Sequence, residues 1–151
     1  MIDTADNPGQ ALGAATEELA YEALQFYTLA RTDPAFIHQY VVDAWALQHA
    51  DERTKPIKIA FALVGLYLHV ERGFSGRQVQ RVHTALARNS LTWPTFALPA
   101  QRGSLTVSQV IAAAAGPERD RAIDAWCASV WDAFRENRPV VIELLDQHRI
   151  G

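Results

Sequence analysis

The stretch "IAFALVGLYL", residues 59–68, is the longest apolar run in the chain and decides the fold. Residues 55–72 around it are apolar on nearly every side of a helical wheel, which is typical of a helix buried at the centre of a bundle. The ten residues of the run are too few to span a bilayer. Gly73 follows at a position where helices commonly end. The run therefore predicts a central core helix.

The sequence on both sides of this run also carries helical periodicity. Asp33 and Pro34 are typical of a helix start, as N-cap and first helical residue. The expected helices cover residues 16–31, 34–50, 55–72, 75–88, 106–116, 118–136 and a last segment that Pro139 opens or kinks. Between the fourth and fifth of these, residues 89–105 contain prolines, a glycine and several large apolar residues, so we expect a long loop lying across the core.

These patterns predict an all-α fold, a single-domain bundle of five to seven helices around a central apolar helix. We expect residues 1–13 to form a flexible leader, because Asn7-Pro8-Gly9 and Gly13 interrupt any helical pattern. Residues 14–151 are expected to form the one helical domain, which is the natural number of domains for a chain of 151 residues.

Composition excludes several classes of function. The net charge is −3 with both signs scattered, so the basic surface of a nucleic-acid-binding protein is missing. The N-terminus resembles neither a signal peptide nor a membrane anchor. The chain has one cysteine, Cys127, which precludes an internal disulfide and a cysteine zinc cluster. We expect a soluble cytoplasmic protein that uses no nucleic acid, no membrane and no cofactor.

The segment expected as the second helix carries polar residues in an apolar setting. On a helical wheel Gln48 lies in the middle of the apolar arc, while Asp43 lies at one edge. His38 and His49 lie together at the other edge, beside Trp45. Each has an ordinary interpretation: exposed or capping histidines, an Asp43 on the surface or paired with an arginine, and a Gln48 that ties helices together.

Glu71 is the polar residue that is hardest to assign to structure alone. It shares a helix face with Tyr67 and other apolar residues in the last turn of the central helix, where a carboxylate opposes the helix dipole. A structural salt bridge and a role in a site are equally consistent with this position. We expect both Gln48 and Glu71 to be largely buried and hydrogen-bonded.

The spacing of the histidines does not favour a metal site. His38 and His49 share a face, but eleven residues separate them, which is about 16 Å along a helix. His69, His83 and His148 each lack a second ligand at the i+3 or i+4 position that zinc-binding helices use. We therefore expect no metal in a protein-only site, although His49, Glu71 and Asp43 from separate helices are an alternative that sequence leaves open.

The chain resembles a bacterial family of small helical proteins catalogued as domain of unknown function 5946. The hallmark of that family is a His followed by Val-Asp-Ala-Tyr-x-x-Gln-His-Pro. Here His38 precedes "VDAWALQHA", residues 42–50, in which Trp45 replaces the tyrosine and Ala50 the proline. "LYLHVERG" (66–73), "LTVSQV" (105–110) and "WCASVWDAF" (126–134) extend the resemblance over most of residues 18–146.

The resemblance implies a helical fold and supplies no activity. It also implies two further histidines in the family, at positions that read Ala62 and Asn137 in this chain. If those histidines are metal ligands or proton carriers in the family, this chain lacks them.

Two hypotheses of function follow. In the first, a small molecule is bound or transformed in a pocket between helices whose walls include Trp45, Tyr67 and the 91–98 loop. Its polar groups would be Asp43, Gln48, His49 and Glu71. In the second, the same residues only build the fold of a non-catalytic interaction module or homodimer, and the loop aromatics face a partner. A solid core with an exposed apolar patch would favour this second hypothesis.

Overall fold

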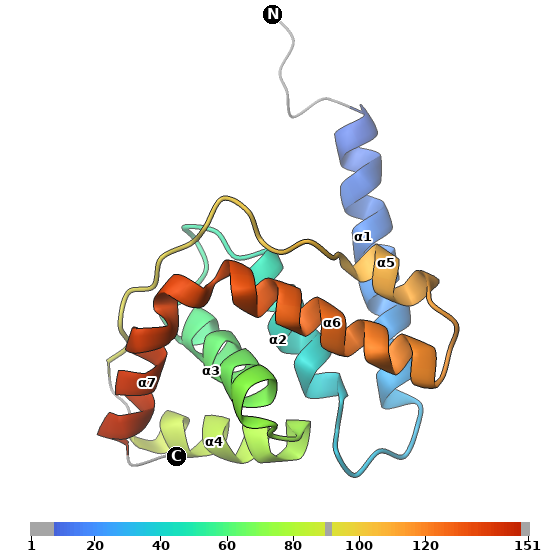
Figure 1. Cartoon of the computed structure of the whole chain (residues 1–151). Helices are drawn as coiled ribbons and strands as arrows, with labels where there is room; N and C mark the ends of the chain where they lie inside the picture. Colours follow the sequence, from blue (N-terminus) through green and yellow to red (C-terminus); the bar gives the residue numbers. More distant parts are fainter. Residues whose placement is uncertain (1–7, 90–91, 149–151) are drawn as a thin grey trace, which may run out of the picture.

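The computed structural model describes residues 8–89 and 92–148. Within these ranges the chain contains no strand and forms seven α-helices and one 3₁₀ turn (Figure 1), which confirms the predicted all-α fold. The elements are α1 (Pro8–Leu29), α2 (His38–Gln48), α3 (Pro56–Arg72), α4 (Gly76–Asn89), α5 (Val107–Ala112), α6 (Pro117–Ala133), the 3₁₀ turn η2 (Arg135–Asn137) and α7 (Arg138–Gln147).

Helix α3 lies at the centre of the bundle, as its sequence predicts. It packs against α2, α4, α6 and α7. Nearly every side chain from Ile59 to Leu68 is buried, because neighbours cover the helix on most sides. Gly73 ends α3 with a left-handed φ of 70°, a conformation that glycine adopts without the steric cost that a Cβ brings.

Helix α1 stands at one side of the bundle, against α2 and α5, and its first turns extend beyond the rest of the molecule (Figure 1). Of the leader expected over residues 1–13, residues 1–7 lie outside the described residues and 8–13 already belong to α1. A proline suits the first turn of a helix. Alanines at positions 11, 14 and 15 favour the helix enough to offset Gly9 and Gly13.

Helix α2 begins at His38 and not at Pro34, where the sequence predicts its start. The Asp33 carboxylate does accept backbone N–H groups, from Ala35 at 3.0 Å and Ile37 at 2.8 Å. It caps only a short turn, however, because Phe36 has a left-handed φ of 57° that interrupts the helical backbone. The preceding loop is thereby directed toward the start of α4, where Arg77 N donates to Ala35 O at 3.0 Å.

The long loop before α5 lies across the core, as expected. Phe96 is buried, and Trp93 and Leu98 pack on the core, whereas Leu91 lies outside the described residues. The buried side chain of Asn137 holds the loop: Ala97 N donates to its Oδ1 at 2.7 Å, and its Nδ2 donates to Ala97 O at 2.9 Å. One amide side chain thus satisfies both backbone groups of a loop residue.

Candidate functional site

Asp43 on α2 is the most deeply buried carboxylate among the described residues, with 3% of its surface exposed. This position corrects the expectation of a surface carboxylate or a partner for an arginine. The reason lies on α3, where Gly65 has no side chain: a Cβ at Gly65 would lie 1.9 Å from Asp43 Oδ2. The glycine therefore provides the space into which the carboxyl group fits.

The two oxygens of Asp43 have different surroundings. Oδ1 accepts a hydrogen bond of 3.1 Å from Gln39 Nε2, one helical turn earlier on α2. Oδ2 is buried and has no hydrogen-bond partner among the described residues. Burial raises the pKa of Asp43 well above its ordinary value, and the bond from Gln39 offsets only part of this effect. An unpaired buried polar atom is rare in native proteins and calls for an explanation.

Asp43 lines a pocket of about 340 Å³ between α2, α3 and α4. Helix α2 forms one wall of the pocket and α3 a second, each with residues spaced one turn apart, and α4 contributes a third wall. The lining residues are Gln39, Val42, Asp43, Ala46, Ile57, Lys58, Phe61, Ala62 and His83. Ile57 and Lys58 are exposed, so they mark the mouth of the pocket. Ala62, one of the two positions at which the resemblance implies a family histidine, is here a small wall residue.

His83 has a defined tautomer in this pocket. Its Nε2 lies 2.7 Å from the carbonyl oxygen of Phe61, and a carbonyl only accepts, so Nε2 carries the hydrogen. Nδ1 consequently presents a lone pair. The ring also stacks on Phe61, with centroids 4.7 Å apart. Burial lowers the pKa of His83, which favours the neutral imidazole. The pocket thus combines a base, Nδ1 of His83, with a carboxyl group that burial favours in its protonated form.

Gln48 lies in a different environment, between α2, α6 and the loop before α5. Its Nε2 donates to Leu105 O at 2.7 Å and to Arg102 O at 3.2 Å, and its Oε1 accepts from Trp126 Nε1 at 2.9 Å. The predicted hydrogen bonding is confirmed, although the side chain is half-buried rather than fully buried. Every one of these contacts joins segments distant in sequence, so Gln48 ties the fold together.

Glu71 on α3 also accepts a hydrogen bond from a tryptophan of α6 and has further partners. Its Oε2 accepts from Trp131 Nε1 at 2.7 Å, and Arg138 Nε donates to both carboxylate oxygens at 2.8 and 3.0 Å. The predicted hydrogen bonding is therefore confirmed, whereas burial is partial, since 21% of the side chain is exposed. Tyr67, from the same helix, packs against the Trp131 ring at 5.7 Å.

Trp45 and His49 form a ring stack at the junction of α1 and α2. Trp45 lies between Tyr21, with centroids 4.2 Å apart, and His49, at 3.6 Å. His49 is exposed at the end of α2, where Nδ1 meets Trp45 O at 3.0 Å and Nε2 meets Glu17 at 3.3 Å. Together with Gln48, Glu17 and Arg102, His49 lines a pocket of about 190 Å³.

The six candidate residues therefore do not converge on one interior pocket. Asp43 lines the pocket between α2, α3 and α4, Gln48 and His49 line another, and Glu71 and Tyr67 contact α6 and Arg138. The metal alternative from His49, Glu71 and Asp43 is not assembled. Across residues 8–89 and 92–148, no group of three or more His, Cys, Asp or Glu side chains is arranged to hold a metal ion.

Sequence reasoning missed three polar residues of the pocket, Gln39, Lys58 and His83. The spacing of Gln39 and Asp43, four residues apart, is the usual spacing for a side-chain hydrogen bond along a helix and could have paired them. His83 carries no comparable signal, because its approach to α3 depends on how α4 packs.

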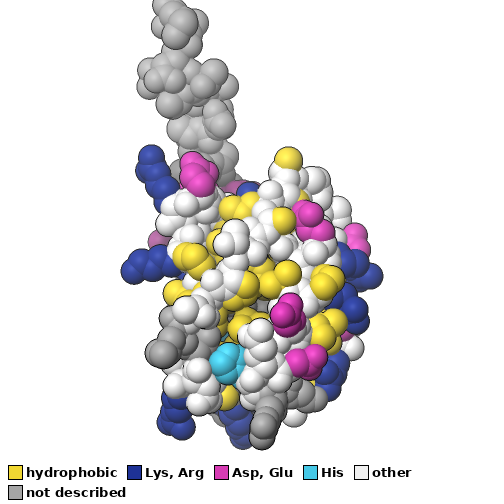
Figure 2. All heavy atoms as spheres, turned by 90° about the vertical axis from the view of Figure 1, so that its left-hand side faces the viewer, with side chains coloured by type: hydrophobic (Ala, Val, Ile, Leu, Met, Phe, Trp, Pro, Cys, Tyr) yellow, Lys and Arg dark blue, Asp and Glu magenta, His cyan; other side chains and the backbone are white. Residues whose placement is uncertain are grey.

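A further pocket of about 250 Å³ lies on the face that α7 forms with the loop before α5. Figure 2 shows hydrophobic side chains gathered around a hollow on that face; Trp93, Pro94, Val140 and Leu144 line the pocket. No buried polar atom without a partner is found there among the described residues. The pocket that contains Asp43 is therefore the stronger candidate site.

Fold and site together define a small all-α protein with an apolar interhelical pocket built around one buried carboxyl group. The chain belongs to the Family of unknown function (DUF5946), whose profile matches residues 13–135. No curated protein and no solved structure shows a significant match to the chain. Among the described residues, no helix is long and apolar enough to cross a membrane.

Proposed function

We propose that this protein binds a small organic molecule in the pocket between α2, α3 and α4, with Asp43 as its polar anchor. The observation that carries the proposal is the buried Oδ2 of Asp43, which lacks a donor among the described residues. Leaving such an atom unpaired costs roughly 1–3 kcal/mol. Oδ2 lies against Gly65, so a ligand recovers this cost when the carboxyl group turns toward the pocket and accepts its hydrogen bond.

The walls and size of the pocket support the same function. Apolar side chains line most of it, and ligand pockets are typically apolar with a few polar groups that orient the ligand. Its volume of about 340 Å³ lies within the range of roughly 300–1,000 Å³ that is usual for such sites. Transformation of the ligand would use His83 Nδ1 as a base, because that atom carries a free lone pair.

Native mass spectrometry of freshly purified protein tests this proposal. The comparison variant is Ala46→Phe, which fills the pocket from α2 without removing a hydrogen bond. We expect a retained mass on the wild-type protein that is absent from the variant. An identical pattern of adducts on both proteins would place any ligand elsewhere and refute the proposed pocket.

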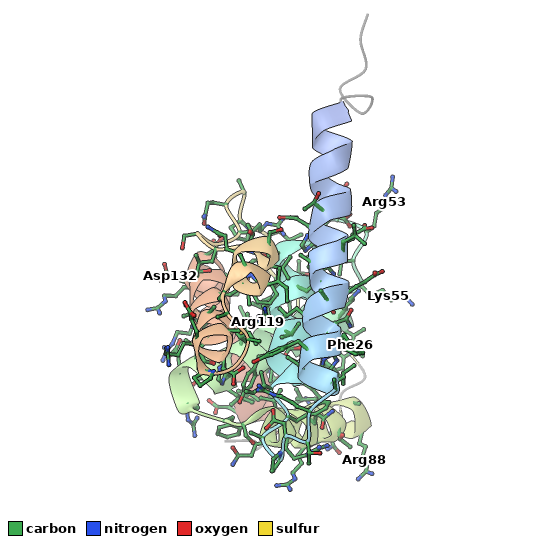
Figure 3. The ribbon with its side chains drawn as sticks, turned by 90° about the vertical axis from the view of Figure 1, so that its right-hand side faces the viewer. Phe26, Arg53, Lys55, Arg88, Arg119 and Asp132 are labelled. Carbon is green, nitrogen blue, oxygen red and sulfur yellow. The ribbon has the colours of Figure 1, made fainter. Side chains whose placement is uncertain are left out.

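A second candidate function is self-association through the outer face of α1. Among the described residues, three of the four exposed large hydrophobic side chains lie on this face: Leu19 at 65%, Phe26 at 75% and Leu29 at 57% exposed. Glu18 and Glu22 are also exposed on this helix, and Figure 3 shows Phe26 on α1. A two-fold interface pairs one patch with itself, so the exposed apolar side chains of this face suit contact with a second copy.

Light scattering during size-exclusion chromatography tests self-association. We expect a mass of twice 16.8 kDa for the wild-type chain and a monomer for Phe26→Glu. Because Phe26 is exposed, the substitution leaves the core intact. A wild-type monomer at high protein concentration would exclude the second copy as the partner of this face.

The proposal places the protein in the cytoplasm. Its only cysteine, Cys127, is a free and fully buried thiol, and burial raises the pKa of that thiol. A reducing compartment keeps such thiols reduced. Detection of the protein in the soluble cytosolic fraction of lysed cells tests this placement.

A further inference from the structure

Once Asp43 is ionised, the polar groups of the pocket between α2, α3 and α4 share one property: their unused atoms are hydrogen-bond acceptors. Asp43 Oδ2 has no donor within the described chain. His83 Nδ1 carries a lone pair, because the ring hydrogen is on Nε2, which donates it to Phe61 O. Gln39 donates its Nε2–H to Asp43, and its side-chain carbonyl oxygen takes no part in that bond. Such a set of acceptors selects a ligand that brings donors.

We infer that the ligand is an organic ammonium, a primary amine carried on a compact apolar body. This inference rests on the proposed small-molecule function and names the class of ligand. An ammonium group has three N–H donors and no acceptor, so it complements these acceptors. A carboxylate or phosphate in its place would bring no donor to His83 Nδ1 and would repel an ionised Asp43.

The remaining walls fit the apolar part of the same molecule. Val42, Ala46, Ile57, Phe61 and Ala62 present hydrocarbon surface between Asp43 and the mouth. Their burial by the ligand adds stabilisation of about 25 cal/mol for each Å² of apolar surface removed from water. A bare ammonium ion would gain none of this, so the site favours an amine with an attached ring or branched chain.

The charge balance of the complex is also favourable. When the ammonium binds, Asp43 releases its proton to solvent, and the carboxylate and ammonium form a neutral pair. Lys58 is the cationic residue of the pocket lining, but it is exposed at the mouth, where water and salt screen its charge. Asp43, by contrast, is shielded from water, and there opposite charges attract more strongly.

Three probes of nearly equal shape separate the chemistry from the fit: 2-phenylethylamine, 2-phenylethanol and propylbenzene. They place NH₃⁺, OH and CH₃ at the same point of the molecule. Titration calorimetry at neutral pH should give an affinity for the amine roughly 10- to 100-fold above that for propylbenzene, the effect expected of a hydrogen bond to a charged group. The alcohol should fall between the two.

Asp43→Asn removes the charge and keeps the shape of the side chain. We expect it to lose the preference for the amine while propylbenzene binds as before. The control is Asp132→Asn on α6, which removes one negative charge at a side chain that is 76% exposed and should leave all three affinities unchanged. Circular dichroism confirms that both variants are folded.

The possible failures are distinct. Binding of propylbenzene or the alcohol as tightly as the amine would overturn the ammonium inference and leave the small-molecule pocket in place. A preference for the amine that survives Asp43→Asn would also overturn it. If none of the three probes binds the wild-type protein, the pocket itself is refuted together with the inference.

Discussion

Two regions of the bundle bury polar side chains in opposite ways. Along α6, the indoles of Trp126 and Trp131 donate to Gln48 and Glu71, and each acceptor side chain has further partners. Between α2, α3 and α4, Asp43 is more deeply buried than Gln48 or Glu71, yet one of its oxygens has no partner in the described chain. The first region uses polarity to hold helices together, and the second retains an unmet hydrogen-bonding capacity.

This difference separates structural from functional polar residues better than burial does. A polar group whose hydrogen bonds are all made stabilises the folded protein, and a ligand can form few additional hydrogen bonds with it. A buried group with an open lone pair destabilises the empty protein and gains a partner only on binding. Replacement of the polar side chain itself should therefore change stability in opposite directions in the two regions.

The largest expected effect is that of Gln48→Leu. The substitution leaves the fully buried Trp126 indole without an acceptor and the carbonyls of Leu105 and Arg102 without a donor. We expect the free energy of unfolding to fall by roughly 3 kcal/mol, because each unsatisfied buried group costs about 1–3 kcal/mol. Urea denaturation measures it. Gln147→Leu, at an exposed position on α7, is the matched control and should change little.

Gly65→Ala tests the steric basis of the site. A Cβ at this position would lie 1.9 Å from Asp43 Oδ2 and 3.2 Å from Val79 Cγ1. We expect the unfolding free energy to fall by roughly 2 kcal/mol, the usual cost of overpacking a core. The double variant with Asp43→Ala should recover most of the loss. Equal losses in the single and double variants would show that the carboxyl group is not the obstacle.

Asp43→Asn should stabilise the empty protein, by roughly 1–3 kcal/mol at neutral pH, because a neutral amide is cheaper to bury than a carboxylate. Burial raises the pKa of Asp43 above 3.8 in the folded state. The wild-type contribution to stability is therefore complete below about pH 4 and is lost as pH rises toward the folded-state pKa. The gain of the variant should be absent at pH 3.5 and grow toward neutral pH.

Other titratable groups face Asp43 and must be held constant in that comparison. They are Tyr21 from α1, Lys58 from α3, His83 from α4 and Cys127 from α6. Because wild type and variant share them, the difference between the two stability curves isolates Asp43. A difference that does not vary between pH 3.5 and 7 would mean that the pKa of Asp43 is not raised by folding.

The smallest effect is expected for Glu71→Gln. Glutamine retains an oxygen that accepts the Trp131 indole and loses only the charge opposite Arg138, whose side chain is 44% exposed. Exposed ion pairs contribute less than about 1 kcal/mol, so the loss in thermal denaturation should be slight. Glu71→Leu, which leaves the indole unpaired, should cost more. If both variants lost the same stability, the ion pair rather than the indole bond would dominate.

The sequence predicts the bundle and its central helix because helical periodicity is a local property. It also selects Gln48 and Glu71 correctly as hydrogen-bonded residues, since a polar residue on an apolar face requires partners. It misplaces Asp43, because the wheel describes one helix and the burial of Asp43 depends on a missing side chain on another, Gly65. His83 was missed for the same reason: the packing of α4 against α3 is a tertiary property.

The start of α2 gives a similar lesson at the level of the backbone. Asp33 and Pro34 predict a helix start, and Asp33 does cap the following amides. Nothing in the residue type of Phe36 indicates its left-handed conformation, since aromatic residues rarely adopt it. The close packing of the α4 N-terminus against this turn determines the outcome instead, as the Arg77 N to Ala35 O bond shows.

The contact between Gly65 and Asp43 also constrains how this chain can evolve. With Asp43 in place, almost any side chain at position 65 would collide with its carboxyl group, so natural selection can accept a change there only after position 43 has become smaller. The order of the two substitutions therefore matters: a change at Asp43 followed by one at Gly65 avoids the collision, whereas the reverse order passes through it. Relatives that carry an acidic residue at the equivalent of position 43 should keep glycine at the equivalent of position 65, and the two positions should vary together.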